Sequence, residues 1–138
     1  MDAEYETVHT VTRYWDGPRG GVADYQGSPH ADEVLFNEKE DDWSSLCLLR
    51  PIDQETFRLA LEDWRRWLRW RAAYDEGRTS LETHPVLPED QQRHEEIQPV
   101  LEERLTIDPR TAIRARGDFR IIGGEWCVRW TPTGEGKP

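Results

Sequence analysis

Hydrophobic and polar positions alternate with a period of two near the start of the chain. In Glu4–Tyr14, aromatic and β-branched side chains such as Tyr5, Val8 and Val11 are interspersed with polar ones. This alternation is typical of a β-strand. Three more short apolar runs follow, at Gly21–Tyr25, Glu33–Asn37 and Trp43–Leu49. Because the connections between these runs are short, the pattern predicts a meander of four antiparallel strands.

The pattern changes to a helical period after Arg50-Pro51. Asp53 is suited to be the N-cap of a helix and Gly77 its C-cap. On a helical wheel the apolar side chains fill an arc of roughly 220°, so we expect the helix to pack on both the sheet and a second helix. This arc contains Phe57, Leu59, Ala60, Leu61, Trp64, Trp67, Leu68, Trp70 and Tyr74. The charged side chains predicted to face water are Arg58, Glu62, Arg65, Arg66 and Arg69.

A second helical pattern covers Glu89–Leu105, and Pro99 within it predicts a kink or two short helices. Strand character returns in Ala112–Phe119 and Glu125–Thr131. The predicted fold class is therefore α+β. It comprises an antiparallel β-meander or partly open barrel, completed by the C-terminal strands and packed against a long Trp-rich helix and a second, Pro-kinked helix.

The chain has 138 residues, which is near the common size of one domain. Its 7 Trp, 4 Tyr and 3 Phe compensate for a low apolar fraction, because each buried aromatic removes a large area from water. We expect a single domain, 1–138, with an ordered core of about 4–132. Short flexible tails are expected at Met1–Ala3 and Thr133–Pro138, where no apolar pattern is present.

The net charge is −10, and residues 1–50 contribute four basic and eleven acidic side chains. An acidic protein is repelled by phosphate backbones and anionic lipids, so nucleic acid and membrane surfaces are unfavourable partners. A basic protein would be attracted instead. The charge also serves to keep a cytoplasmic protein in solution.

The two cysteines, Cys47 and Cys127, lie in apolar strand-like runs and are expected to be reduced thiols. The N-terminus, MDAEYE, lacks the basic and apolar stretches of a signal peptide. No segment approaches the ~18 apolar residues of a membrane span. These features predict a cytoplasmic location and no membrane association.

The most conspicuous short motif is Asp16-Gly17-Pro18-Arg19-Gly20-Gly21. In a functional interpretation, Arg19 holds a carboxylate or phosphate and Asp16 orients it. In a structural interpretation, the glycines and the proline only shape a hairpin turn. The motif is not a P-loop, because no Gly-Lys-Ser/Thr follows it.

The sequence offers little support for metal or nucleophilic chemistry. The four histidines, His9, His30, His84 and His94, are at least ten residues apart, and neither cysteine lies beside a second ligand. There is no G-x-S-x-G motif. We therefore expect no metal and no cofactor, identify no catalytic residue, and lean against an enzyme.

Arginines and tryptophans alternate in Trp64–Arg71, a pattern that can stack nucleic-acid bases. The helical wheel instead assigns the tryptophans to packing and most of the arginines to solvent. Arg71 is the exception because it falls within the apolar arc, where a guanidinium must reach a carboxylate or the surface. We expect it to pair with a carboxylate of the sheet, for which Asp16 and Asp24 are candidates.

Three segments carry a resemblance to a known group of proteins. The runs Tyr14–Gly27 and Asp53–Trp70 resemble a family of small proteins of cyanobacteria and actinobacteria. Thr83-His84-Pro85, followed by Leu87-Pro88-Glu89-Asp90, also resembles that family. The resemblance implies a single cytosolic bacterial domain, and it adds no substrate and no catalytic residue.

Two main functional interpretations follow. A third, nucleic-acid binding, would require the arginine face of the long helix and the basic residues of Arg110–Arg120 to lie together. The favoured one is a small acidic cytosolic binding protein, inhibitor-like or immunity-like toward a basic protein, that presents the acidic loop Glu38–Asp42 and the glycine turn. The alternative is a small enzyme or ligand-binding barrel with a pocket between sheet and helix near Arg71. The candidate binding residues are Trp15, Asp16, Arg19, Asp24, Tyr25, His30 and Arg71, with Tyr14, Trp64 and Trp67 as further pocket lining.

Overall fold

A computed structural model describes residues 5–133. The described chain divides into two compact units, one formed by residues 5–53 and 106–133, the other by residues 54–105. We describe each unit by itself, and the assignment of a single domain stays a prediction. The predicted flexible tails, apart from Thr133, lie outside the described residues.

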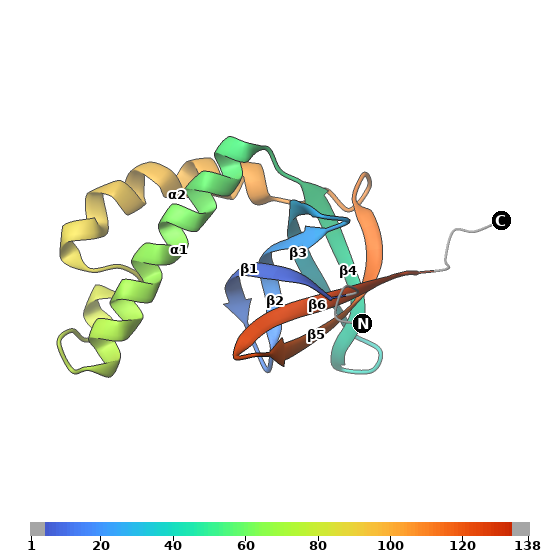
Figure 1. Ribbon diagram of the computed structural model, residues 1–138, viewed down its shortest axis with the longest axis horizontal. Helices are drawn as coiled ribbons and strands as arrows, with labels where there is room; N and C mark the ends of the chain where they lie inside the picture. Colours follow the sequence, from blue (N-terminus) through green and yellow to red (C-terminus); the bar gives the residue numbers. More distant parts are fainter. Residues whose placement is uncertain (1–4, 134–138) are drawn as a thin grey trace. The chain divides into compact units, whose positions relative to one another are not determined.

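The first unit is a closed barrel of six antiparallel strands that follow one another in sequence order around the wall (Figure 1). The strands are β1 (Tyr5–Tyr14), β2 (Pro18–Tyr25), β3 (Ser28–Asn37), β4 (Asp42–Pro51), β5 (Ile113–Ile122) and β6 (Glu125–Pro132). The α+β class and the completion of the sheet by the C-terminal strands are thus confirmed.

Strand β1 closes the barrel by pairing with two neighbours along its length. Its first residues pair with β6, where Thr7 is opposite Cys127, and its later residues pair with β2, where Val8 is opposite Ala23. The expectation of a partly open barrel is wrong. Closure gives the backbone groups at the start of β1 and along β6 hydrogen-bonding partners that an open edge would leave to solvent.

The second strand begins earlier than the pattern predicts, at Pro18 inside the glycine motif. Gly21 allows this extension because β1 approaches closely there. A Cβ atom at Gly21 would lie 2.2 Å from the backbone oxygen of Thr10. The glycine therefore serves the close contact of two strands as well as the preceding turn.

The buried apolar side chains of the barrel unit are small or medium-sized. They are Val22, Ala23, Ala31, Val34, Cys47, Leu48, Leu49, Ile107, Ala115 and Val128. Successive positions such as Cys47 and Leu48 face opposite sides of a strand, so these residues do not all point into the barrel interior. Larger aromatic rings lie toward the ends of the barrel, where Trp130 contacts both Tyr25 and Phe119.

The second unit contains two α-helices and two short 3-10 helices. They are α1 (Gln54–Asp75), η2 (Leu81–Thr83), η3 (Pro88–Asp90) and α2 (Gln91–Leu105). Helix α1 ends at Asp75 and is followed by the predicted capping glycine, Gly77, whose φ is 77°, and the backbone N–H of Arg78 donates to the Ala73 carbonyl across the cap. Helix α2 runs continuously through Pro99, so the predicted division into two short helices is wrong.

Helices α1 and α2 pack on each other through both charged and apolar side chains. Arg93 of α2 donates two hydrogen bonds to Glu62 of α1, at 2.7 and 3.1 Å. Arg66 donates to the same carboxylate at 2.5 Å, and its own side chain is largely buried. The prediction that Glu62 and Arg66 face water is therefore wrong. Arg93 of α2 is the partner of Glu62, and Asp90 of η3 lies 3.7 Å from Arg66, so both side chains have the partners that make their burial tolerable.

The tryptophans of α1 occupy different environments. Trp70 is buried, and its indole N–H donates to the Thr83 hydroxyl at 2.8 Å while its ring stacks on Tyr74. Trp64 and Trp67 are partly exposed and stack on each other with ring centroids 5.0 Å apart. Packing of α1 on the sheet stays a prediction.

Candidate functional site

Three of the barrel's hairpin turns lie at the same end, the lower end in Figure 1. Strands β1, β3 and β5 run toward this end and β2, β4 and β6 run away from it, because every neighbouring pair is antiparallel. The turns between β1 and β2, β3 and β4, and β5 and β6 therefore meet there. We call their combined exposed surface the hairpin end, formed by residues 14–19, 36–43 and 120–126.

Arg19 organises the first of these turns. Its guanidinium donates to the backbone oxygens of Trp15 and Asp16, at 2.8 and 2.6 Å. It also lies over the indole of Trp43, 4.7 Å from the ring centroid. The cation thus holds the turn through backbone carbonyls and an aromatic face, which favours the structural interpretation of the glycine motif.

The second turn carries the acidic loop. Glu38, Glu40, Asp41 and Asp42 are all exposed. No ion pair reaches any of these four carboxylates from the described part of the chain. Elsewhere in the barrel, carboxylates such as Asp24 and Asp118 are paired with His9 and with Arg120. The acidic loop is therefore a concentration of negative charge that the fold itself does not neutralise.

Three further candidate residues lie near the opposite end of the barrel. Asp24 and Tyr25 end β2, and His30 lies near the start of β3. The Asp24 carboxylate is 2.9 Å from Nε2 of His9, and Nδ1 of the buried His30 is 2.8 Å from the Ser28 backbone oxygen. The rings of Tyr25 and His30 meet edge to face, with centroids 5.3 Å apart.

The candidate residues of the barrel therefore do not form one cluster. Trp15, Asp16 and Arg19 are brought together at the hairpin end, whereas Asp24, Tyr25 and His30 gather at the other end of β2. Tyr14 and Trp15, expected to line a pocket, are mostly exposed.

Arg71 belongs to the helical unit and is exposed. Its guanidinium pairs with Asp75, one turn further along α1, at 3.2 Å, and it lies 6.0 Å from the centroid of the Trp67 ring. The expected pairing with a sheet carboxylate is wrong. A partner four residues away on the same helix satisfies the charge at the surface, so no buried ion pair is needed.

A buried acidic group of the barrel, Asp32, was not among the candidates. Asp32 of β3 is buried, and this burial raises its pKa to about 7, although Arg13 acts to lower it. Burial and the nearby Asp32 charge raise the pKa of the Cys47 thiol to about 12. A thiol held protonated in this way is inert as a nucleophile. Both cysteines are free thiols, with Cys47 buried and Cys127 partly exposed.

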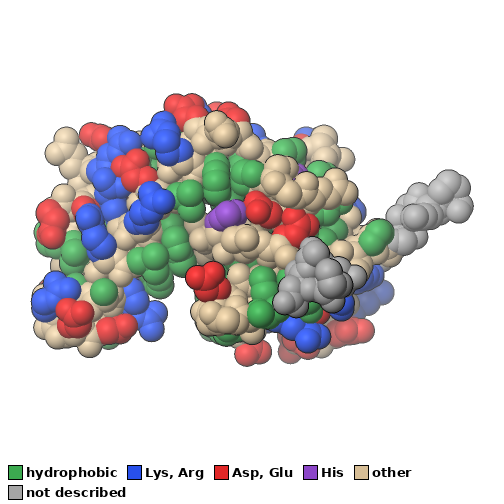
Figure 2. All heavy atoms as spheres, in the orientation of Figure 1, with side chains coloured by type: hydrophobic (Ala, Val, Ile, Leu, Met, Phe, Trp, Pro, Cys, Tyr) green, Lys and Arg blue, Asp and Glu red, His purple; other side chains and the backbone are tan. Residues whose placement is uncertain are grey.

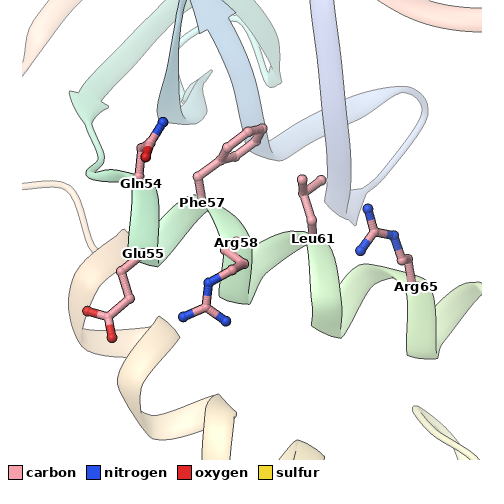
Figure 3. Close-up of a pocket in the computed structure, with 6 residues that line it drawn as sticks. All are labelled: Gln54, Glu55, Phe57, Arg58, Leu61 and Arg65. Carbon is pink, nitrogen blue, oxygen red and sulfur yellow. The ribbon is translucent and has the colours of Figure 1, made fainter.

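The helical unit has an open pocket of about 490 Å³ along the first half of α1. Figure 3 shows Phe57 and Leu61 extending from the same side of this helix, with the guanidinium of Arg65 beyond them. The lining is completed by Gln54, Glu55 and Arg58. Glu55 is paired with Arg104 at 2.9 Å. This lining contains no histidine, cysteine or hydroxyl group that could act as a nucleophile or a proton acceptor near neutral pH.

Residues 5–133 contain no group of three histidine, cysteine or acidic side chains arranged to hold a metal ion. Over the same residues, no helix has both the length and the apolar character needed to cross a membrane.

The sequence reasoning missed part of the hairpin end. The predicted strand Ala112–Phe119 ends before Ile121 and Ile122, which were given no role, yet both belong to β5 and are exposed. A signal was present, because large apolar residues stand directly before a turn in Tyr14-Trp15-Asp16-Gly17 and again in Ile121-Ile122-Gly123-Gly124. Side chains at such positions lie at the ends of strands, where the barrel does not bury them.

With this geometry established, comparison with known proteins adds no relative: no family model, no curated protein and no solved structure matches the chain.

Proposed function

We propose that this protein is a small acidic binding protein of the bacterial cytosol, without enzymatic activity, that recognises a basic protein. An inhibitor-like or immunity-like role toward that partner fits its size and charge. The observation that carries the proposal is the set of four exposed carboxylates in the loop Glu38–Asp42, none of which has an ion-pair partner among the described residues.

The distribution of charge supports this assignment of the surface. In the helical unit, acidic side chains are interleaved with arginines, as Figure 2 shows, and many are paired. Paired surface charges attract little from outside because their fields largely cancel. The unpaired acidic loop therefore provides the field that would steer a cationic partner toward the barrel.

The test is affinity capture from a bacterial lysate with the whole chain as bait. We expect a basic protein to be retained at low salt and released as salt rises above the physiological ~0.15 M, because exposed charges are then screened. A loop variant carrying Glu38→Gln, Glu40→Gln, Asp41→Asn and Asp42→Asn should no longer retain the basic protein.

The matched control has the same net charge as the loop variant. It carries glutamine at four exposed acidic positions of the helical unit, Glu76, Glu82, Glu89 and Glu95. This control should retain the partner. If both variants lost the partner equally, total charge rather than the acidic loop would be responsible for binding. If the wild-type chain retained no salt-sensitive basic protein, the proposal would be contradicted.

A further inference from the structure

The hairpin end exposes an unusual amount of apolar surface. In the described residues, eight large hydrophobic side chains are exposed, and five of them belong to this end. These five are Tyr14, Trp15, Phe36, Ile121 and Ile122. Trp15 is 73% exposed and Ile121 60%. Apolar groups gathered in this way, beside polar ones, mark a surface that another molecule covers.

Two contacts connect the three hairpins into one surface. The rings of Tyr14 and Trp126 meet at a centroid distance of 6.5 Å, which joins the first hairpin to the third. Arg19 lies over Trp43, which joins the first to the second, and Trp43 in turn packs edge to face on Phe36 at 5.2 Å. The exposed apolar side chains therefore stand on turns that brace one another.

The Arg19 contacts fix the turn that bears Trp15. Because the guanidinium donates to the carbonyls of both Trp15 and Asp16, the backbone that follows the indole is held before any partner arrives. A side chain on a pre-organised turn loses less conformational entropy on binding than one on a free loop. Tryptophan is also the residue type most often found at the energetic centre of an interface.

The chemistry of this surface defines the partner more closely than charge alone. Its apolar side chains share one end of the barrel with the unpaired carboxylates of the acidic loop, and the face seen in Figure 2 shows hydrophobic and acidic groups together there. Aromatic faces attract ammonium and guanidinium groups, and aliphatic side chains attract apolar ones. The complementary surface has an apolar side chain surrounded by lysine or arginine.

We infer that the hairpin end binds a basic protein segment that inserts an apolar side chain between Trp15 and the Ile121–Ile122 turn while its cations meet the acidic loop. This inference rests on the proposed function, and it adds that apolar contact, rather than charge alone, selects the partner. Arg19 then acts as a positioning residue for Trp15 and does not itself bind an anion.

Two synthetic peptides of equal length and charge test this inference with the whole chain. One alternates lysine and leucine in a helical pattern, and the other has glutamine in place of leucine. We expect the lysine–leucine peptide to bind about tenfold more tightly by tryptophan fluorescence titration, since burying one apolar side chain is worth about that factor. A Trp15→Ser, Ile121→Ser variant should bind the two peptides equally.

The control is Leu68→Ser, Leu81→Ser, which removes two exposed apolar side chains from the helical unit and should leave the difference unchanged. Near-ultraviolet circular dichroism checks that both variants remain folded. If the two peptides bind the wild-type chain equally and the four loop substitutions weaken both, the inference fails while the proposed function stands. If neither peptide binds at low salt, the inference and the proposed function both fail.

A second copy of the chain is the competing occupant. Sedimentation of the wild-type protein decides this case, because a monomer at the titration concentrations leaves the surface available to the peptide. Self-association that disappears in Trp15→Ser, Ile121→Ser would assign the hairpin end to a dimer contact and overturn the inference.

Discussion

Asp32 makes the stability of the barrel depend on pH. Its side chain is buried, its register partners are Gly21 of β2 and Leu49 of β4, and it accepts no side-chain hydrogen bond within the described residues. With its pKa raised to about 7 by burial, the folded protein holds this proton more tightly than the unfolded chain does. Below about pH 4 the protonated Asp32 therefore does not reduce the free energy of unfolding. As the pH rises from about 4, ionisation of Asp32 is favoured in the unfolded chain, so the free energy of unfolding falls, and it is lowest above about pH 7.

Asp32→Asn should remove this decline, because the amide is neutral at every pH. We expect the variant to match the wild type near pH 4 and to exceed it by up to about 4 kcal/mol at pH 8, the free energy of a pKa raised by roughly three units. Urea unfolding across this pH range measures the difference. Glu33→Gln, on the neighbouring half-exposed position, is the control, and parallel pH profiles for wild type and Asp32→Asn would refute the account.

Gly21 tests the close approach of β1 and β2. In Gly21→Ala the new methyl group would meet the Thr10 backbone, which cannot move without disturbing the strand pairing. We expect a loss of about 3 kcal/mol or more in the free energy of unfolding. Gly27→Ala, at a turn with open space around it, should cost only the ~1–2 kcal/mol of its positive φ. Similar losses for the two variants would show that the contact is relieved at little cost.

For single residues, prediction from the sequence succeeded where a residue's role depends on its neighbours along the chain. Gly77 could be assigned as a helix cap because the cap is a local arrangement. Asp32 and Arg71 could not be assigned correctly. The burial of Asp32 depends on strands β2 and β4, and the partner of Arg71 depends on how its side chain extends along the helix.

Among the elements, the contact between α1 and α2 depends on Glu62. Hydrogen bonds from Arg93, and to a lesser degree from Arg66, hold the pKa of this carboxyl at about 2, although burial acts to raise it. Its contribution to stability is present above about pH 4.5 and is lost as the pH falls toward 2. The buried Asp90, which pairs with Arg69 and lies near Arg66, extends the same network.

Glu62→Gln should therefore weaken the helical unit at neutral pH. The substitution leaves Arg66 and Arg93 without their shared carboxylate, and removing one partner of a largely buried pair costs about 3 kcal/mol. Thermal unfolding followed by circular dichroism measures the loss, which should vanish near pH 2. Glu96→Gln, which removes only an exposed partner of Arg93, is the control and should change stability by less than about 1 kcal/mol.

The order and type of the elements were largely predictable, because each strand and helix has its own hydrophobic period. Closure of the barrel was not, since it depends on pairing between Tyr5–Thr7 and residues 127–129 at the other end of the chain. For α2 the sequence left two alternatives open, a kinked helix or two short helices, and the structure has one helix that contains Pro99. Proline within a helix removes one backbone hydrogen bond and clashes with the preceding turn. Burial of Ile97 and Leu101, two residues before and after Pro99, stabilises the helix on both sides of it.

For the whole molecule, the central claim is that the hairpin end binds a basic, partly apolar partner. The acidic loop was visible in the sequence, and the surface was not. Topology alone brings residues 14–19, 36–43 and 120–126 to one end of a closed barrel. The proposed class of partner therefore rests on the charge pattern of the sequence, and the proposed surface rests on the strand order.

Nuclear magnetic resonance tests this claim most directly, by titrating the isotope-labelled whole chain with the lysine–leucine peptide and following each backbone amide. We predict that the signals of Trp15, residues 36–43 and residues 120–126 shift, together with the indole N–H of Trp15, and that added salt reverses the shifts. Shifts confined to residues 54–105, or to the barrel end that contains Tyr25 and His30, would contradict the account.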